Sequence, residues 1–184
     1  KVIYNSFAAN IKAINKDEAK DRLNLHGNII LSCGRLTAWK GFGALIELMP
    51  ELTRLHSDLK LIIVGSGPEE ANLKLQIAAL GFENKVKLAG QVVQAEMPLY
   101  YSAADLFILN SGYEGMSHVL LEALSYKLPV AVSNSGGNPE VIHNNVNCLL
   151  FKYNNKNEIF MAVEKILNNP DLAMKFSKES RQIL

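Results

Sequence analysis

Two cations directly after the first apolar run of the chain could bind one anion. Arg35 follows the run 29–33 within Gly34-Arg35-Leu36, and Lys40 comes shortly after it. The planar fork of an arginine and the point charge of a lysine suit a diphosphate. We expect Lys40 to begin the next helix, where the helix dipole disfavours a cation, and this favours a ligand role. Two solvated surface cations are an equally open alternative.

A carboxylate stands inside a strongly apolar segment. Residues 117–126 predict a deeply buried helix, and Glu122 lies in its middle. A buried carboxylate without hydrogen-bond donors is strongly disfavoured. The hydroxyls of a ribose could supply these donors, and a structural partner such as a backbone amide or an arginine is the alternative.

The loop before this helix carries Glu114 and leads to a helix start that could bind an anion. The first N–H groups of a helix have no intrahelical acceptor, and the helix dipole favours negative charge there. A diphosphate is the ligand that we expect at this position, and Gly115 lets the backbone approach it closely. The amides concerned belong to Gly115, Met116, Ser117, His118 and Val119.

Two glycine turns follow other apolar runs. Gly65-Ser66-Gly67 resembles the start of a dinucleotide-binding fingerprint, but its third glycine is missing. Glu69 and Glu70 would repel a phosphate in the first turn of the next helix. We therefore predict a tight turn and reject a nicotinamide or flavin site. Ser135-Gly136-Gly137-Asn138 could line the same crevice or only turn the chain.

Short β-rich runs alternate with amphipathic stretches, and these elements position the residues above. We predict strands at 29–33, 59–64, 85–88, 106–109, 130–133 and 148–151. We predict helices at 41–56, 68–80, 95–104, 117–126, about 139–143, and from 157 onward with a break at Pro170. Strands that are apolar throughout predict an α/β fold with a doubly wound parallel sheet. Ligands in such folds bind outside the carboxyl ends of the strands.

Length and composition indicate a single domain over residues 1–184. Residues 1–27 begin β-like at 1–4 and then become polar, which we interpret as an entry segment. The formal charge of +1 lacks the basic excess typical of nucleic-acid-binding proteins, and we expect no nucleic-acid partner. The apolar runs are too short to cross a bilayer and no signal peptide is visible, so we expect a cytoplasmic protein.

The cysteines and histidines indicate neither a disulfide nor a metal site. Cys33 and Cys148 lie in separate apolar runs, so we predict buried, unpaired thiols. The histidines have no metal-ligand spacing, and no bound metal is expected. They are His26, His56, His118 and His143.

The motifs, taken in order, resemble the C-terminal domain of the GT-B glycosyltransferases of family 4, the glycosyl transferases group 1. The resemblance spans nearly the whole chain, about residues 1–166, and is specific as an ordered set. The motifs are Gly34-Arg35-Leu36 with Lys40-Gly41, 64–69, 86–90, 101–107, the pair Glu114 and Glu122 within 111–123, Pro129-Val130 and 136–142. Asn5-Ser6 replaces a common Asn-Gly, and Cys148 replaces a frequent glycine.

The resemblance implies a role for each matching residue. Arg35 and Lys40 would hold the donor diphosphate and stabilise the leaving nucleoside diphosphate, and Glu114 would hold the donor sugar; these are the expected catalytic residues. Glu122 would bind the ribose hydroxyls. The other donor-binding positions contribute mainly backbone groups near the sugar, the phosphates or the base. They are Gly34, Gly90, Gln91, Val92, Gly115, Met116, Ser117, His118 and Val119.

The resemblance also implies an activity. The intact enzyme would be a retaining hexosyltransferase of polysaccharide biosynthesis that uses a UDP- or GDP-sugar, needs no metal or other cofactor, and serves a glycan or lipid-linked acceptor. The acceptor-binding N-terminal domain is expected to lie outside this chain, which alone would bind donor but turn over little. Peripheral association with the inner face of the membrane is left open. A sugar-nucleotide epimerase of related two-domain fold and a non-catalytic nucleotide-binding α/β module are the rival interpretations.

Overall fold

A computed structural model describes residues 14–115, 117–138 and 142–180. Its centre is a six-stranded sheet in the order β3-β2-β1-β4-β5-β6, and every neighbouring pair of strands is parallel. The predicted doubly wound α/β fold is therefore confirmed. The strands are β1 Ile29–Cys33, β2 Lys60–Val64, β3 Val86–Gly90, β4 Leu106–Leu109, β5 Val130–Ser133 and β6 Leu149–Phe151.

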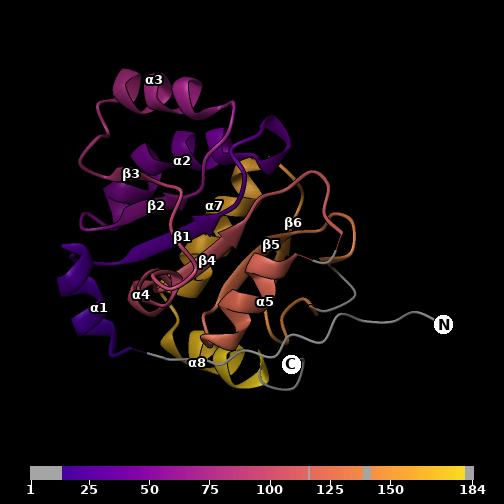
Figure 1. Cartoon of the computed structure of the whole chain (residues 1–184). Coiled ribbons are helices and arrows are strands. Elements are labelled where there is room, and N and C mark those ends of the chain that lie inside the picture. Colours follow the sequence, from indigo (N-terminus) through magenta and orange to yellow (C-terminus); the bar gives the residue numbers. More distant parts are fainter. Residues whose placement is uncertain (1–13, 116, 139–141, 181–184) are drawn as a thin grey trace.

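Helices cover both faces of this sheet (Figure 1). On one face lie α1 Lys16–Leu23, α4 Met97–Ala103 and α5 His118–Ser125. On the other lie α2 Phe42–Leu55, α3 Glu70–Leu80, α7 Lys156–Leu167 and α8 Pro170–Glu179. Successive strand residues point to opposite faces, so that Ile30 packs in the core beside α2 while Ile29 and Leu31 pack in the core beside α4. Because both faces are buried, the strands are apolar throughout.

The strand order reverses at β1, which pairs with β2 on one side and with β4 on the other. The chain leaves β1 at Cys33 and β4 at Leu109, next to each other at the carboxyl edge of the sheet. This is the position at which open α/β sheets bind ligands, since the loops diverge there and leave a crevice.

The first helix, which lies within the segment 1–27 interpreted as an entry segment, was not predicted. The side chain of Asn15 caps α1 by accepting from the amides of Asp17 at 2.9 Å and Glu18 at 3.3 Å. Only Ala19 of this helix is buried, so it carries no apolar stripe that a sequence pattern could show. The predicted strand at 1–4 lies outside the described residues.

Other element boundaries differ in smaller ways. Helix α2 ends at Leu55, one residue before the predicted end at 56, and Leu55 is 61% exposed. The third helix begins at Glu70, two residues after the predicted start at Pro68. The predicted helix at about 139–143 falls largely on residues 139–141, outside the described part of the chain.

The glycines after β2 allow two loops to touch. Gly65 has φ +145°, and a Cβ there would lie 1.9 Å from the carbonyl oxygen of Gly34. The Leu36 amide donates to the Ser66 carbonyl oxygen at 2.9 Å, so the loops after β1 and β2 are bonded backbone to backbone. This close packing accounts for Gly65 and for Gly67, where a Cβ would lie 2.4 Å from the Leu36 carbonyl oxygen.

We predict that Gly65→Ala lowers the free energy of unfolding by about 3 kcal/mol, because it adds both a strained φ and a backbone clash. Gly81→Ala is the matched control, since Gly81 has φ +70° but no atom within 4 Å of the position that an added methyl group would take. Its cost should be about 1 kcal/mol. Urea denaturation of both variants measures the difference, and equal losses would contradict the proposed loop contact.

Candidate functional site

A lysine and a glutamate meet at the carboxyl edge of the sheet. The Lys40 ammonium forms an ion pair with Oε1 of Glu114, which belongs to the loop after β4. The two side chains are only 15% and 11% exposed. The stem of Lys40 lies over Gly34, where a Cβ would be 3.6 Å from Lys40 Cε. The structure thus brings Gly34, Lys40 and Glu114 together at the point where the strand order reverses.

Lys40 does not begin a helix, and that expectation is wrong. It ends a 3₁₀ turn, Ala38–Lys40, and α2 begins only at Phe42 after Gly41. Gly41 has φ +57°, a left-handed conformation that breaks the chain direction between the two elements. The dipole argument for a ligand role therefore fails, and the ion pair with Glu114 takes its place as the observation that places Lys40 in the crevice.

The end of β4 holds this turn in place. Buried Asn110 donates from Nδ2 to the Gly41 carbonyl oxygen at 2.9 Å and to Asn154 Oδ1 at 2.8 Å. The Gly112 amide donates to the Trp39 carbonyl oxygen at 2.7 Å. Sequence reasoning missed Asn110, although a polar residue directly after an apolar strand is a signal that could have found it. These bonds fix the backbone on both sides of Lys40.

The second glycine turn supports Glu114. A Cβ on Gly136 would lie 1.8 Å from the Glu114 carbonyl oxygen, and the Gly137 amide donates to the same oxygen at 2.9 Å. Of the two interpretations left open for this turn, the structure favours the one in which it borders the crevice, since it holds the backbone of the carboxylate.

Glu122 finds two protein donors. Its Oε2 accepts from the Tyr101 hydroxyl at 2.7 Å, and its Oε1 accepts from Gln94 Nε2 at 3.3 Å. Glu122 is half-buried on a helix whose other residues are mostly buried. Both partners are protein groups, which is what the structural alternative expected, although they are a tyrosine hydroxyl and a side-chain amide and not a backbone amide or an arginine. Tyr101 and Gln94 themselves were not predicted. A carboxylate has about four acceptor positions, so capacity for a further donor remains.

The buried thiols and Tyr101 are uncharged groups. Burial raises the pKa of Tyr101 above its usual range, and neighbouring Cys33 and Glu122 raise it further. Burial likewise raises the pKa of Cys33, and it raises the pKa of Cys148 to about 12. Both cysteines are unpaired and buried, as predicted.

Arg35 is exposed, and its guanidinium forms no ion pair or hydrogen bond within the part of the chain that the structure describes, whereas its carbonyl oxygen accepts from the Thr37 amide at 2.9 Å. The guanidinium therefore shares no protein acceptor with Lys40. The Gly90 carbonyl oxygen accepts from the Gly65 amide at 2.8 Å, which places the end of β3 beside the same cluster of loops. Gln91, exposed, and Val92, half-buried, follow Gly90.

The loop that carries Glu114 leads directly into the start of α5. Ser117 is its N-cap and makes no side-chain capping bond, and His118 at the first helical position is exposed. A Cβ on Gly115 would meet nothing within 4 Å, so the backbone there is open to an approaching group. Val119 is half-buried. Met116, also predicted to contribute an amide, lies outside the described residues.

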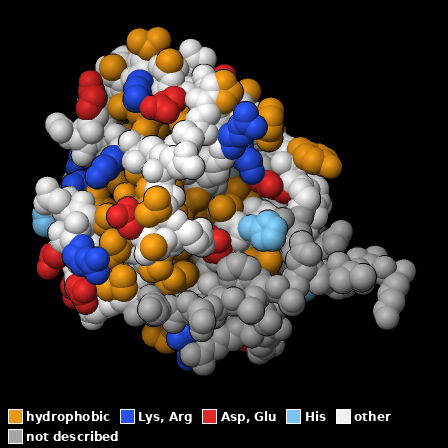
Figure 2. Space-filling view, in the orientation of Figure 1, with side chains coloured by type: hydrophobic (Ala, Val, Ile, Leu, Met, Phe, Trp, Pro, Cys, Tyr) orange, Lys and Arg blue, Asp and Glu red, His pale blue; other side chains and the backbone are white. Residues whose placement is uncertain are grey.

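Charge is spread over the visible surface instead of forming one basic face (Figure 2). Within residues 14–115, 117–138 and 142–180, no three His, Cys, Asp or Glu side chains are grouped so that they could hold a metal. In the same residues no helix is long and apolar enough to cross a membrane.

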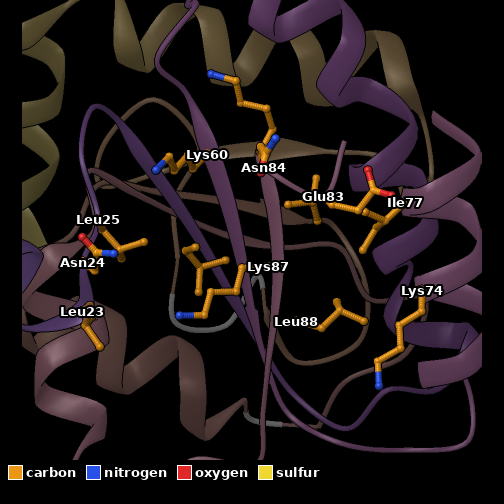
Figure 3. Close-up of a pocket in the computed structure, with 13 residues that line it drawn as sticks. Leu23, Asn24, Leu25, Lys60, Lys74, Ile77, Glu83, Asn84, Lys87 and Leu88 are labelled. Atoms are coloured by element: carbon orange, nitrogen blue, oxygen red, sulfur yellow. The ribbon is translucent and has the colours of Figure 1, made fainter. Parts of the chain in front are cut away.

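A groove of about 550 Å³ lies near the amino ends of β2 and β3, away from the carboxyl edge that holds Lys40 and Glu114 (Figure 3). Residues near the starts of β2 and β3 line it, among them Lys60, Asn84 and Lys87. The ammonium groups of Lys60, Lys74 and Lys87 do not meet at one point in this view. Lys87 lies on β3, the edge strand of the described sheet, and fits protection of that edge against pairing with another chain.

Comparison with known proteins gives one family. The sequence model described as glycosyl transferases group 1 matches residues 13–183. An uncharacterized glycosyltransferase of Haemophilus influenzae is 34% identical over 158 residues, covering 85% of this chain and 44% of that protein. A GDP-mannose-dependent alpha-(1-6)-phosphatidylinositol monomannoside mannosyltransferase of Mycobacterium tuberculosis is 28% identical over 160 residues, covering 83% of this chain and 42% of its own length.

A solved structure agrees with these relatives. The crystal structure of Alr3699/HepE from Anabaena in complex with UDP has a TM-score of 0.88 and 26% identity. It covers 100% of this chain and 52% of the Anabaena protein. The chain therefore spans about half the length of the proteins that it matches.

We predict that Lys40 and Glu114 stabilise each other by more than a surface pair does, because their side chains are largely shielded from water. A double-mutant cycle with Lys40→Met and Glu114→Gln should give a coupling free energy of about 1–2 kcal/mol in urea denaturation. The exposed pair Lys74–Glu70, 63% and 36% exposed, is the control and should couple by about 0.3–0.5 kcal/mol. Coupling of equal size in both cycles would show that the crevice pair is no more than a surface contact.

Proposed function

The chain belongs to the glycosyl transferases group 1 family, and from this premise we propose that it is the C-terminal, donor-binding domain of a retaining hexosyltransferase. It would hold a nucleotide-diphosphate sugar while the intact enzyme transfers the hexose to a glycan or lipid-linked acceptor. The observation that carries the proposal is the Lys40–Glu114 pair beside Gly34 at the carboxyl edge of the sheet. Both of its charges are positioned where an α/β sheet accepts a ligand.

The two cations have different tasks in this proposal. The Arg35 guanidinium has no protein partner among the described residues, so it is available for a bidentate bond to a phosphate. Lys40 would exchange Glu114 for the diphosphate, which releases the Glu114 carboxylate to accept from sugar hydroxyls. Negative charge grows on the diphosphate as the sugar leaves, so cations fixed there stabilise the transition state more than the ground state.

Backbone groups complete the proposed donor site. The amides of His118 and Val119 at the start of α5 suit a phosphate, because hydrogen bonding and the helix dipole act together there. Gly115 and Ser117, with Met116, would contact the sugar. The backbone at 90–92 would border the base, and Glu122 would bind the ribose hydroxyls.

The choice of base is left to experiment. HepE was solved with UDP, and the mycobacterial relative depends on GDP-mannose. We therefore propose a UDP- or GDP-sugar as the donor. The side chains do not distinguish the two bases, because the proposed contacts to the base come from the backbone. Family membership favours a transferase over the rival sugar-nucleotide epimerase. A non-catalytic nucleotide-binding module would bind the nucleotide but belong to an inactive parent protein.

Two further features belong to the proposal. Arg35, Lys40 and the start of α5 supply positive potential, so diphosphate binding would need no metal ion. The intact enzyme would act in polysaccharide biosynthesis on the cytoplasmic side of the membrane, where lipid-linked acceptors are within reach.

The test is calorimetric titration of the chain with UDP, GDP, ADP and the matching free nucleosides, in buffer that contains a chelator. We predict that Arg35→Ala weakens the preferred diphosphate by about 1–3 kcal/mol, the range for a charged hydrogen bond, and leaves the nucleoside unchanged. Arg54→Ala is the matched control, because this exposed arginine lies in the last turn of α2. It should leave both ligands unchanged.

Three results would count against the assignment. No binding of any diphosphate would refute the donor site. Equal losses for nucleoside and diphosphate in Arg35→Ala would mean that the arginine supports the fold instead of the phosphate. A strict requirement for added magnesium or manganese would refute metal-independent binding.

A further inference from the structure

The two oxygens of Glu122 are held unequally. Oε2 accepts from Tyr101 at 2.7 Å, an ideal length, whereas Oε1 accepts from Gln94 at 3.3 Å, near the limit of a hydrogen bond. Tyr101 is 1% exposed, and Gln94 is exposed to solvent. One oxygen is therefore fixed from inside the protein, and the other has a partner that water or a ligand can replace.

Tyr101 has little freedom to move. Its ring stacks on Tyr126 with centroids 5.2 Å apart and an interplanar angle of 17°, and it meets Phe107 at 6.2 Å in a tilted arrangement. Neighbouring Ala103 and Ala104 are fully buried, so this end of α4 is embedded in the core. The hydroxyl is thus a fixed donor aimed at Glu122.

Gln94 lies in a different setting. It belongs to the loop between β3 and α4, where Val93 is 62% exposed. An exposed amide held by one long bond loses little when another donor replaces it, because water compensates the amide. Gln94 has the properties of a temporary partner for Oε1.

We propose that Tyr101 is a positioning residue that fixes the Glu122 carboxylate through Oε2 and so determines selectivity for ribose over deoxyribose, with Oε1 passing from Gln94 to a ribose hydroxyl. This inference rests on the proposed function, in which Glu122 binds the ribose. Tyr101 itself does not touch the donor. Its hydroxyl orients the carboxylate, and the oriented carboxylate distinguishes nucleotides that carry the 2′- and 3′-hydroxyls from those that lack them.

The physical basis is pre-organisation. A carboxylate held in one orientation loses little freedom when a diol binds to it. Without the Tyr101 hydroxyl, Oε2 has no protein donor among the described residues, and the carboxylate turns toward water or Gln94. The diol must then reorder it, so the advantage of a hydroxylated ribose falls while the phosphate contacts stay intact.

The experiment compares UDP with 2′,3′-dideoxy-UDP by calorimetry on the chain, or the guanosine pair if GDP is preferred. For the unchanged chain we expect the hydroxylated nucleotide to bind roughly tenfold more tightly, as for one charged hydrogen bond. Tyr101→Phe should reduce this ratio to about threefold or less, by weakening UDP and sparing the dideoxy nucleotide. Tyr100→Phe removes the same hydroxyl from the adjacent residue of α4 and should keep the full ratio. Gln94→Ala should also keep it.

The outcomes separate this inference from the function on which it rests. If Tyr101→Phe weakens both nucleotides equally, Tyr101 is merely structural and the inference is overturned while donor binding stands. If the unchanged chain binds UDP and its dideoxy form equally, Glu122 does not select ribose and the inference is also overturned. If neither UDP nor GDP binds the unchanged chain, the proposed function itself fails. Urea denaturation of Tyr101→Phe confirms that each affinity is measured on folded protein.

Discussion

The Lys40–Glu114 ion pair is the contact on which the organisation of the crevice depends. It joins the segment after β1 to the loop after β4, the two strands between which the sheet order reverses. Two hydrogen bonds support it: the Asn110 side chain holds the turn at Gly41, and the Gly137 amide holds the carbonyl oxygen of Glu114. A largely shielded ion pair needs this support, because either charge alone would be costly there.

The sheet explains why the polar chemistry gathers at one edge. Helices cover both faces, so the interior of the sheet admits almost only apolar side chains. Polar groups that need a fixed position are then placed where the strands end. Ser133 shows the pattern at the end of β5, since its hydroxyl donates to the Ser111 carbonyl oxygen at 2.7 Å and ties the ends of β4 and β5 together.

The sequence predicted the sheet well and the contacts within the crevice less well. Continuous apolar runs located all six strands, because that pattern reflects burial on two faces. Helix α1 escaped prediction because distant partners stabilise it: Asp105 accepts from Lys16 at 2.8 Å and from Lys20 at 3.0 Å. The cost of a buried carboxylate correctly indicated that Glu122 needs donors, but no local pattern shows that Tyr101 and Gln94 supply them.

In the proposed function, a nucleoside diphosphate binds at the carboxyl edge of the sheet and replaces Glu114 as the ion-pair partner of Lys40. Nuclear magnetic resonance of the isotope-labelled chain, titrated with UDP or GDP, tests it most directly. We predict that the side-chain ammonium signal of Lys40 and the amide signals of Gly34, Gly90 and Val119 shift together and reach saturation at one nucleotide concentration. The amides of Asn84 and Lys87, in the groove at the other end of the edge strand, should stay in place. Shifts confined to that groove, or an unchanged Lys40 signal at saturation, would contradict it.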